Sequence, residues 1–488
     1  MKGLNIRQTE YEAVIGLEVH AGLAVNTKMY CGCKTEFGAE PNTQCCPVCT
    51  GMPGALPVLN RKAVEYAIKA GLATNCSIIR YSRQDRKHYF YPDLPKGYQA
   101  SQHNLPLCTG GFLEIEVNMS AKKVGIRGIH IEEDAGKLIH DESGKYSLVD
   151  YNRSGVPLIE IVTAPDLGSS EEVRAFILKL KTILEYTGVC DCKMQEGSLR
   201  VDINLSVRRR GESTFGNRTE IKNLNSVRAI VRAVEYEAKR QAEELEKGRS
   251  VRQETRRWDD ARGVSYPMRE KKGADDYRFF PDPDLCPIVI DDAWLNEIKS
   301  SLPELPDEKK KRFVLEYKLP AYDADFITGS KQLSDYFEEA AKRCRNHRAV
   351  CNWLMGDISK KLNESNIEVS DIPVSPENLA KLVELTDSGI ISWKIAKQVF
   401  VVMWDTNRDP AEIIEEKGLR VINDTEEIRK VIIQVLEENP KAVEDIRNGK
   451  EKTIGFLIGQ VMRKTGGKAS PGIVNRLIFE ELERLFHE

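Results

Sequence analysis

Leu199-Arg-Val-Asp-Ile-Asn-Leu-Ser-Val-Arg208 is the stretch of sequence that most clearly decides the fold. Apolar and polar residues alternate along it, with the period of two expected of a strand that buries one face. A helix is then predicted from Ala229 to about Lys247, because Asn225 and Ser226 can cap its start and Gly248 can end it. This is the clearest long helix in the N-terminal half of the chain.

The sequence around this stretch predicts an α+β protein with three domains. Short strands and turns prevail from about Tyr11 to Ile290, and helical periodicity follows the proline-rich stretch Phe280–Pro287. A second change near Asp409 introduces a small set of amphipathic helices. The predicted domains are a sheet-rich catalytic domain at residues 1–293, a helical domain at 294–408 and a small helical tail domain at 409–488. The clearest helical segments are Leu333–Arg343, Val350–Leu362, Leu379–Leu385, Glu426–Glu438, Ile454–Lys464 and Pro471–Phe486.

Bulk composition limits the class of protein. The chain has 488 residues, which is too long for one hydrophobic core, and 41% of them are hydrophobic. No apolar stretch approaches the roughly 20 residues that a membrane span needs. The segment Met1–Arg7 lacks the apolar centre of a secretory signal. We therefore expect a cytoplasmic protein, with no membrane partner. The net charge of −3 neither supports nor excludes RNA.

Cysteines are concentrated near the N-terminus, in a pattern that predicts a structural zinc site. Cys31 and Cys33 are followed by Cys46 and Cys49, two close pairs whose thiolates can surround one tetrahedral Zn²⁺. Cys45, beside Cys46, could take its place, and a chance cluster of buried thiols is the alternative. Free thiols and metal sites of this kind suit a reducing cytoplasm better than a disulfide framework does.

Several acidic residues occupy strand-like segments, which suggests a cation-binding site. In Val14–His20, alternation places Glu18 and His20 on one face of a strand. Glu132 and Glu133 belong to a run of three acids, and Glu160 interrupts an apolar strand, where a lone carboxylate would be costly. Hard oxygen ligands suit Mg²⁺, although an ion pair with arginine would also explain Glu160.

Three loop segments are rich in aromatic, basic and turn-forming residues. Arg86–Gln99 could form a pocket in which Lys87 or His88 contacts phosphate. Thr219–Asn225 and Asp276–Pro281 are similar candidates, and a packed surface corner explains each of them equally well. Glycine-rich nucleotide motifs are absent from the sequence, so any ATP site must be of another kind.

A cationic segment near the C-terminus is a candidate contact for nucleic acid. Arg463, Lys464 and Lys468 fall within six residues of a predicted inter-helix loop, where they could meet a phosphate backbone. A solvated charged loop is the alternative.

Together these segments resemble a known family, the B subunits of aspartyl/glutamyl-tRNA(Asn/Gln) amidotransferases. The resemblance follows the order of the chain and covers nearly all of it. Its motifs are Ile15-Gly-Leu-Glu-Val-His20, Cys46-Pro-Val-Cys-Thr-Gly-Met-Pro-Gly54, His88–Gln99, Glu133-Asp-Ala-Gly-Lys137, Asp150–Val162, Gly197-Ser-Leu-Arg200 and Glu220-Ile-Lys-Asn-Leu-Asn225.

The resemblance implies a catalytic cradle related to the glutamine synthetase and guanidino kinase folds, a helical domain and a YqeY-like tail that contacts tRNA. It implies ATP-dependent conversion of Glu-tRNA(Gln) or Asp-tRNA(Asn) into the amide, with ammonia arriving through a tunnel. The implied partners are the amidase of the same heterotrimer, its small C subunit and the tRNA. The implied ligands of Mg²⁺ are Glu18, His20, Glu133 and Glu160, with Glu132 close by.

Two other functions remain possible on the sequence alone. One is a noncatalytic tRNA-binding scaffold with a zinc knuckle, which would not consume ATP. The other is a free-standing carboxylate–amine ligase acting on a small molecule, which would not need the tail. The sequence does not choose between the two mischarged tRNAs.

Overall fold

The structure is a computed structural model that describes residues 10–141, 143–270, 274–421, 424–448 and 450–487. The segment Met1–Arg7, discussed above for its lack of a signal sequence, lies outside the described residues. The chain forms two compact units, of which the first ends at Leu305 and the second begins at Pro306. Within the described part of the chain, the helices are too short or too polar to cross a membrane.

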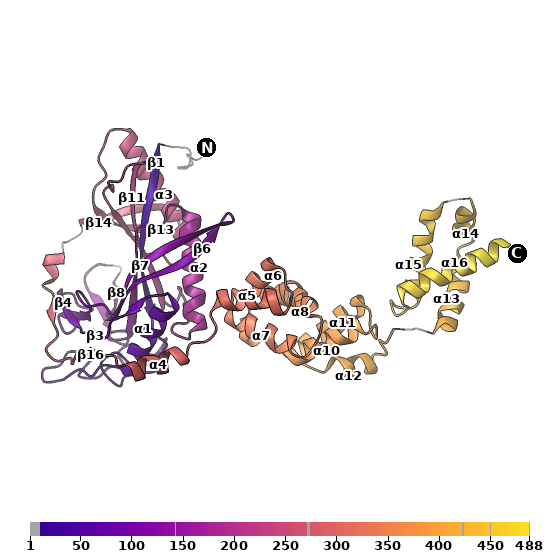
Figure 1. Cartoon of the computed structure of the whole chain (residues 1–488), viewed down its shortest axis with the longest axis horizontal. Coiled ribbons are helices and arrows are strands. Elements are labelled where there is room, and N and C mark those ends of the chain that lie inside the picture. The colour runs from indigo at the N-terminus through magenta and orange to yellow at the C-terminus, as the bar shows by residue number, and fades with distance from the viewer. Residues whose placement is uncertain (1–9, 142, 271–273, 422–423, 449, 488) are drawn as a thin grey trace. The chain divides into compact units, whose positions relative to one another are not determined.

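The first unit is built on a large sheet (Figure 1). Among the described residues, nine strands form this sheet, and adjacent strands are antiparallel except for β12 and β13. In spatial order the strands are β14 (Val264–Glu270), β13 (Glu254–Asp259), β12 (Thr219–Lys222), β11 (Leu199–Arg209), β1 (Tyr11–Gly22), β10 (Pro157–Thr163), β7 (Ser120–Glu133), β6 (Cys108–Val117) and β2 (Ser77–Ile78).

One face of the sheet is apolar and covered by helices. Along β1, the side chains of Ile15, Leu17 and Val19 are buried in the first hydrophobic core. Helix α2 packs on β6, α3 on β11 and α1 on β7, and α4 packs on α1. The helices are α1 (Arg61–Ala73), α2 (Ser170–Tyr186), α3 (Val227–Glu246) and α4 (Asp292–Ser300).

The other face of the sheet is polar, and we call it the open face. Directly opposed residues of an antiparallel pair share a face. Strand β1 places His20 opposite Glu160 of β10, and Glu18 opposite Asp202 of β11. Strand β7 adds His130 opposite Glu160. The open face therefore collects acidic side chains from strands that are far apart in sequence.

Small sheets lie beside the large one. Strands β4, β5 and β15 form a three-stranded sheet, β3 pairs with β16, and β8 pairs with β9. Their bounds are β3 (Tyr81–Ser82), β4 (Asp85–His88), β5 (Tyr98–Ser101), β8 (Lys137–His140), β9 (Ser147–Asp150), β15 (Phe280–Pro281) and β16 (Ile288–Val289).

The second unit is helical and contains two hydrophobic cores. Helices α5 to α12 belong with the first of these cores, and α13 to α16 form the second. Their bounds are α5 (Pro306–Glu316), α6 (Ala321–Thr328), α7 (Lys331–Ala341), α8 (His347–Trp353), a π-helical turn (Leu354–Ile358), α9 (Ser359–Ser365), α10 (Pro376–Asp387), α11 (Trp393–Thr406), α12 (Pro410–Glu416), α13 (Thr425–Glu438), α14 (Pro440–Arg447), α15 (Ile454–Lys464) and α16 (Pro471–His487).

The predicted change from a sheet-rich to a helical part is confirmed. The predicted strand at Leu199 is β11, and the predicted long helix is α3. The predicted boundaries at 293 and 408 differ from the extent of the cores, because Leu295 of α4 packs in the sheet core and Ile413 of α12 packs in the second core. The division into three domains remains a prediction.

Candidate active site and metal centres

Three side chains on the open face come close enough to hold one cation. His20 Nε2 lies 3.8 Å from Glu132 Oε2 and 3.8 Å from Glu160 Oε1. Burial lowers the pKa of His20, so the imidazole is neutral near pH 7 and keeps a lone pair. Burial, followed by the charges of Glu132 and Glu18, raises the pKa of Glu160 to about 8. Such a crowd of carboxylates fits a bound cation.

Glu132 is fixed by the hairpin that crosses the end of its strand. Ser101 Oγ donates to Glu132 Oε1 at 2.6 Å, and Gln99 Nε2 donates to Glu132 Oε2 at 3.4 Å. Both donors lie on β5, whose register with β4 places Lys87 opposite Gln99. The positive charge of Lys87 opposes part of the rise in the pKa of Glu160. The hairpin therefore places Lys87 opposite one of the donors that hold Glu132.

A second group of acids lies next to the first on the open face. Glu18, Asp202 and Glu220 each bring an oxygen within 4.8 Å of the others. Lys222 forms an ion pair with Asp202, and its Nζ lies 3.2 Å from Glu220 Oε1. Burial opposes the charge of Lys222, but these carboxylates outweigh burial and raise its pKa. Asn204 Nδ2 donates to Glu18 Oε1 at 2.9 Å.

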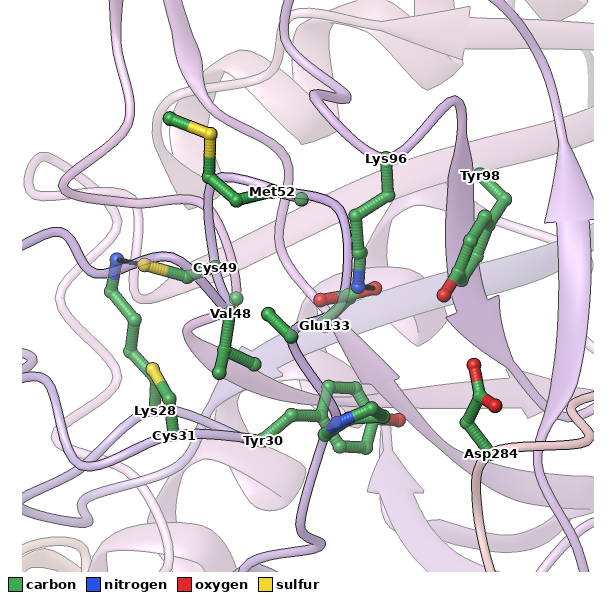
Figure 2. A pocket seen from close by; sticks show the side chains of 14 residues that line it. Lys28, Tyr30, Cys31, Val48, Cys49, Met52, Lys96, Tyr98, Glu133 and Asp284 are labelled. Carbon is green, nitrogen blue, oxygen red and sulfur yellow. Dashed lines mark hydrogen bonds and ion pairs between the residues drawn. The ribbon is translucent and has the colours of Figure 1, made fainter.

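Glu133 is turned away from both groups. Successive residues of a strand point to opposite faces, so Glu133 does not share the face of Glu132. Its carboxylate pairs with Lys96 and accepts the Ala100 N–H at 2.9 Å. Figure 2 shows Lys96 directly beside Glu133, in the wall of a pocket that Tyr30 and Asp284 also line. Coordination of Mg²⁺ by Glu133 would require release from Lys96.

The four predicted zinc ligands are brought together. The sulfur atoms of Cys31, Cys33, Cys46 and Cys49 all lie within 4.8 Å of one another, as four ligands of one tetrahedral Zn²⁺ must. Cys45 Sγ is directed to Asn152 Oδ1, at 3.8 Å. The structure therefore brings Cys46, rather than Cys45, into the group.

A buried lysine balances the charge of the cysteine group. Lys28 is 1% exposed, and its Nζ lies 3.5 Å from Cys49 Sγ and 3.0 Å from the Tyr151 carbonyl (Figure 2). A hydrogen bond from Cys31 and the nearby Lys28 charge lower the pKa of Cys49 to about 4. With Zn²⁺ bound, four thiolates would leave a net charge of about −2, which a buried ammonium would partly offset.

The remaining predicted residues lie elsewhere. His88 Nδ1 is 3.1 Å from the Arg278 carbonyl, and the imidazole stacks on Phe280 rather than joining the carboxylates. Arg463 and Lys464 form the last turn of α15, and Lys464 pairs with Glu438. Only Lys468 of the three cations lies in the loop that follows α15, where all three were expected.

The fold and these groups define a class of protein: a sheet-rich unit that gathers acidic side chains on one open face and four cysteines in one group, followed by a helical C-terminal part. Comparison with known proteins makes the assignment specific. The family described as "GatB/GatE catalytic domain" matches residues 13–296, and the one described as "GatB domain" matches residues 335–482.

Curated relatives are similar to this chain over nearly its whole length. A protein of Caldicellulosiruptor bescii is 60% identical over 479 residues, which is 98% of this chain and 100% of the relative. A protein of Thermoanaerobacter sp. (strain X514) is 57% identical over 475 residues, 97% of this chain and 100% of the relative. Both are named as the B subunit of aspartyl/glutamyl-tRNA(Asn/Gln) amidotransferase. The chain belongs to this family of amidotransferase B subunits.

Proposed function

We propose that this chain activates and amidates the side-chain carboxylate of Glu-tRNA(Gln), Asp-tRNA(Asn) or both, within an amidotransferase of several subunits. The observation that supports this most directly is the open face, where His20, Glu132 and Glu160 converge beside Lys87. The relatives named above carry the same activity in their names. Since mischarged tRNA is made for translation, the enzyme would act in the cytoplasm.

The chemistry needs ATP because a free carboxylate is a poor electrophile. Transfer of the γ-phosphoryl group of ATP to the carboxylate oxygen gives an acyl phosphate and ADP. Ammonia then attacks the acyl carbon, phosphate leaves with the C–O bonding electrons, and loss of a proton from nitrogen gives the amide. The amidase partner would supply ammonia from glutamine, and the small C subunit would complete the heterotrimer.

The chain's own residues would position the reacting groups. The proposed ligands of Mg²⁺ are His20, Glu132 and Glu160, with Glu18 from the adjacent group and Glu133 if it leaves Lys96. Mg²⁺ would neutralise charge on the transferred phosphoryl group, where electrostatics and positioning dominate catalysis. Lys87 would contact a phosphate oxygen, and His88 is a weaker candidate for that role.

The cysteine group and the tail would have supporting roles. We propose structural Zn²⁺ at Cys31, Cys33, Cys46 and Cys49, because four sulfur ligands leave no open coordination position. We also propose that the sheet unit is related to the glutamine synthetase and guanidino kinase folds. The tail, which we propose to be YqeY-like, would bind tRNA.

An amidation assay tests the proposal. The chain is reconstituted with its partner subunits and supplied with glutamine, ATP and either Glu-tRNA(Gln) or Asp-tRNA(Asn). We expect ATP-dependent formation of Gln-tRNA or Asn-tRNA. Absence of both products from a folded, assembled complex would overturn the proposal. Formation of one product alone would define the substrate.

A further inference from the structure

A set of aromatic rings borders the hairpin that holds Lys87. The segment after residue 276 lies along this hairpin, where Phe280 pairs with Arg86 in an antiparallel ladder. Rings from the two segments then meet in pairs. His103 stacks on Phe279 with ring centroids 4.2 Å apart, and Tyr89 meets Tyr277 edge-on at 6.2 Å. We define the aromatic rim as His88, Tyr89, Phe90, Tyr91, His103, Tyr277, Phe279 and Phe280.

Several rings of the aromatic rim stay open to solvent. Phe90 is 77% exposed, Tyr91 52% and Phe280 44%. Single exposed apolar side chains are ordinary, but several exposed rings in paired segments of one unit mark a binding site more often. Packing of the hairpin alone does not explain why these faces remain uncovered in the first unit.

Cations accompany the rings. The Arg278 guanidinium lies 5.7 Å from the centre of the Phe90 ring, and Lys87 Nζ lies 5.1 Å from the centre of the Tyr277 ring. Arg278 has a φ of 45°, a left-handed conformation that a residue other than glycine adopts at an energetic cost. Alternation of rings and cations is the composition that binds single-stranded nucleic acid.

The aromatic rim leads directly to the carboxylates of the open face. Lys87 lies on the same strand as His88, and its charge acts on Glu160. Lys87 lies opposite Gln99 across the hairpin, and Gln99 Nε2 donates to Glu132 Oε2 at 3.4 Å. A nucleotide chain lying on the rim would therefore end next to the site where an acyl group reacts.

We propose that the aromatic rim binds the unpaired nucleotides at the 3′ end of the aminoacyl-tRNA by base stacking, with Arg278 contacting the phosphates between them. This inference rests on the proposed function and adds the surface that delivers the acyl group. The adenine of ATP is the other nucleobase present. An adenine site encloses one base in a pocket, whereas the rim offers several open rings in succession, which suits consecutive unpaired bases.

Binding of intact and shortened tRNA separates the rim from other RNA contacts. Affinity is measured for the assembled complex with deacylated tRNA and with the same tRNA lacking its unpaired 3′ nucleotides. The variants are Phe90→Ala, Tyr91→Ala and Arg278→Ala. Phe215→Ala is the matched control, because Phe215 is 59% exposed and lies 5.5 Å from the Arg208 guanidinium in another part of the unit.

We expect the wild-type complex and the Phe215→Ala complex to lose about tenfold in affinity when the 3′ nucleotides are removed. The Phe90→Ala and Tyr91→Ala complexes should bind intact tRNA about as weakly as the wild type binds shortened tRNA. Their affinity for shortened tRNA should equal that of the wild type. Their KM for mischarged tRNA should rise, while their KM for ATP should not.

Two results would overturn the inference. One is that removal of the 3′ nucleotides lowers tRNA affinity by the same factor in the wild type and in all rim variants. The other is a rise in the KM for ATP with unchanged tRNA binding, which would assign the rim to adenine. Neither result touches the proposed function, which is tested by amide formation in the wild-type complex. Binding is measured without catalysis, so the two tests fail independently.

Discussion

At the scale of single residues, the raised pKa of Glu160 indicates that the open face would be stabilised by a cation. Burial, and then the charges of Glu132, Glu18 and Asp202, raise the pKa of its carboxyl group to about 8. In the described surroundings of Glu160, Lys87 is the cation whose charge opposes this rise most. A divalent cation would offset the repulsion between these carboxylates and could then bind the phosphates of ATP.

Glu160→Gln should therefore lower amidation turnover by at least about 10²-fold, because it replaces a carboxylate that would ligate the cation with a neutral amide of the same size. Affinity for tRNA should stay within about twofold, since the tail and the rim are untouched. Single-turnover amidation and tRNA binding measure the two effects. Glu116→Gln is the control, because Glu116 is exposed on β6. Near-normal turnover in Glu160→Gln would remove this residue from the site.

The cysteine group gives a second prediction at this scale. Wild-type protein purified without chelator should contain about one equivalent of zinc, and Cys45→Ser should keep it, because Cys45 faces Asn152. The double variant Cys33→Ser, Cys49→Ser should lose the metal and unfold at a lower temperature. Elemental analysis and thermal unfolding check this. Loss of zinc from Cys45→Ser, with retention in Cys46→Ser, would exchange their roles.

The sequence could predict which residues face the same way, but not which strands meet. Alternation within one strand identified Glu18 with His20, and the cost of burial identified Glu160. Asp202 was part of the predicted strand at Leu199, yet nothing local placed it opposite Glu18, because strand register depends on residues distant in sequence. Lys96 was missed as the partner of Glu133 because it lies in a turn, 37 residues away in sequence.

At the scale of elements, helix caps fix where the covering helices begin. Ser226 is the N-cap of α3, and its Oγ accepts the Ala229 N–H at 3.0 Å. Ser169 caps α2 in the same way, with Oγ accepting the Glu172 N–H at 3.2 Å. Both helices cover the apolar face of the sheet, so their ends determine how much of that face they bury.

Ser226→Ala should lower the free energy of unfolding of the first unit by about 1 kcal/mol, because the N–H groups at the start of α3 lose an acceptor. Urea-induced unfolding followed by circular dichroism measures this change. Ser250→Ala is the control, since Ser250 is exposed in a loop. A change below about 0.3 kcal/mol would mean that water replaces the cap at no cost.

Elements with strong local patterns were predictable, and others were not. The sequence-predicted helices at Glu426, Ile454 and Pro471 correspond to α13, α15 and α16 almost residue by residue. Helix α2 was missed although Ser169 and Glu172 have the spacing of a capping box, a signal that was present in the sequence. Helix α14 has only eight residues, too few for a clear helical period.

At the scale of the whole molecule, the proposed sites are divided between the two units. The open face and the cysteine group belong to the first unit, and the proposed tail contacts belong to the second. The change from a sheet-rich to a helical part was predictable, because alternating apolar residues give way to helical periodicity along the chain. The cores extend past the predicted boundaries, since α4 and α12 pack by burial of Leu295 and Ile413 rather than by composition.

The tail cations give the last prediction. Each lysine or arginine that neutralises a phosphate releases counterions, so its loss weakens binding and flattens the salt dependence by roughly one unit of slope or slightly less. Arg463 is exposed, whereas Lys464 is engaged by Glu438. Arg463→Ala should therefore lower the salt slope by the full amount expected for one cation. Lys464→Ala should lower the salt slope by less.

Glu438→Gln provides a control of opposite sign. It releases Lys464 from its ion pair, so tRNA affinity should rise slightly and the salt slope should steepen.

The triple variant Arg463→Ala, Lys464→Ala, Lys468→Ala should lose between about one and three units of slope. It should keep its turnover at saturating tRNA, because the proposed reaction takes place in the first unit. Titration of tRNA binding against salt in the assembled complex measures both effects. If the triple variant and Glu438→Gln both retain wild-type affinity and slope while folded, these cations are a solvated surface and the tail meets tRNA through other residues.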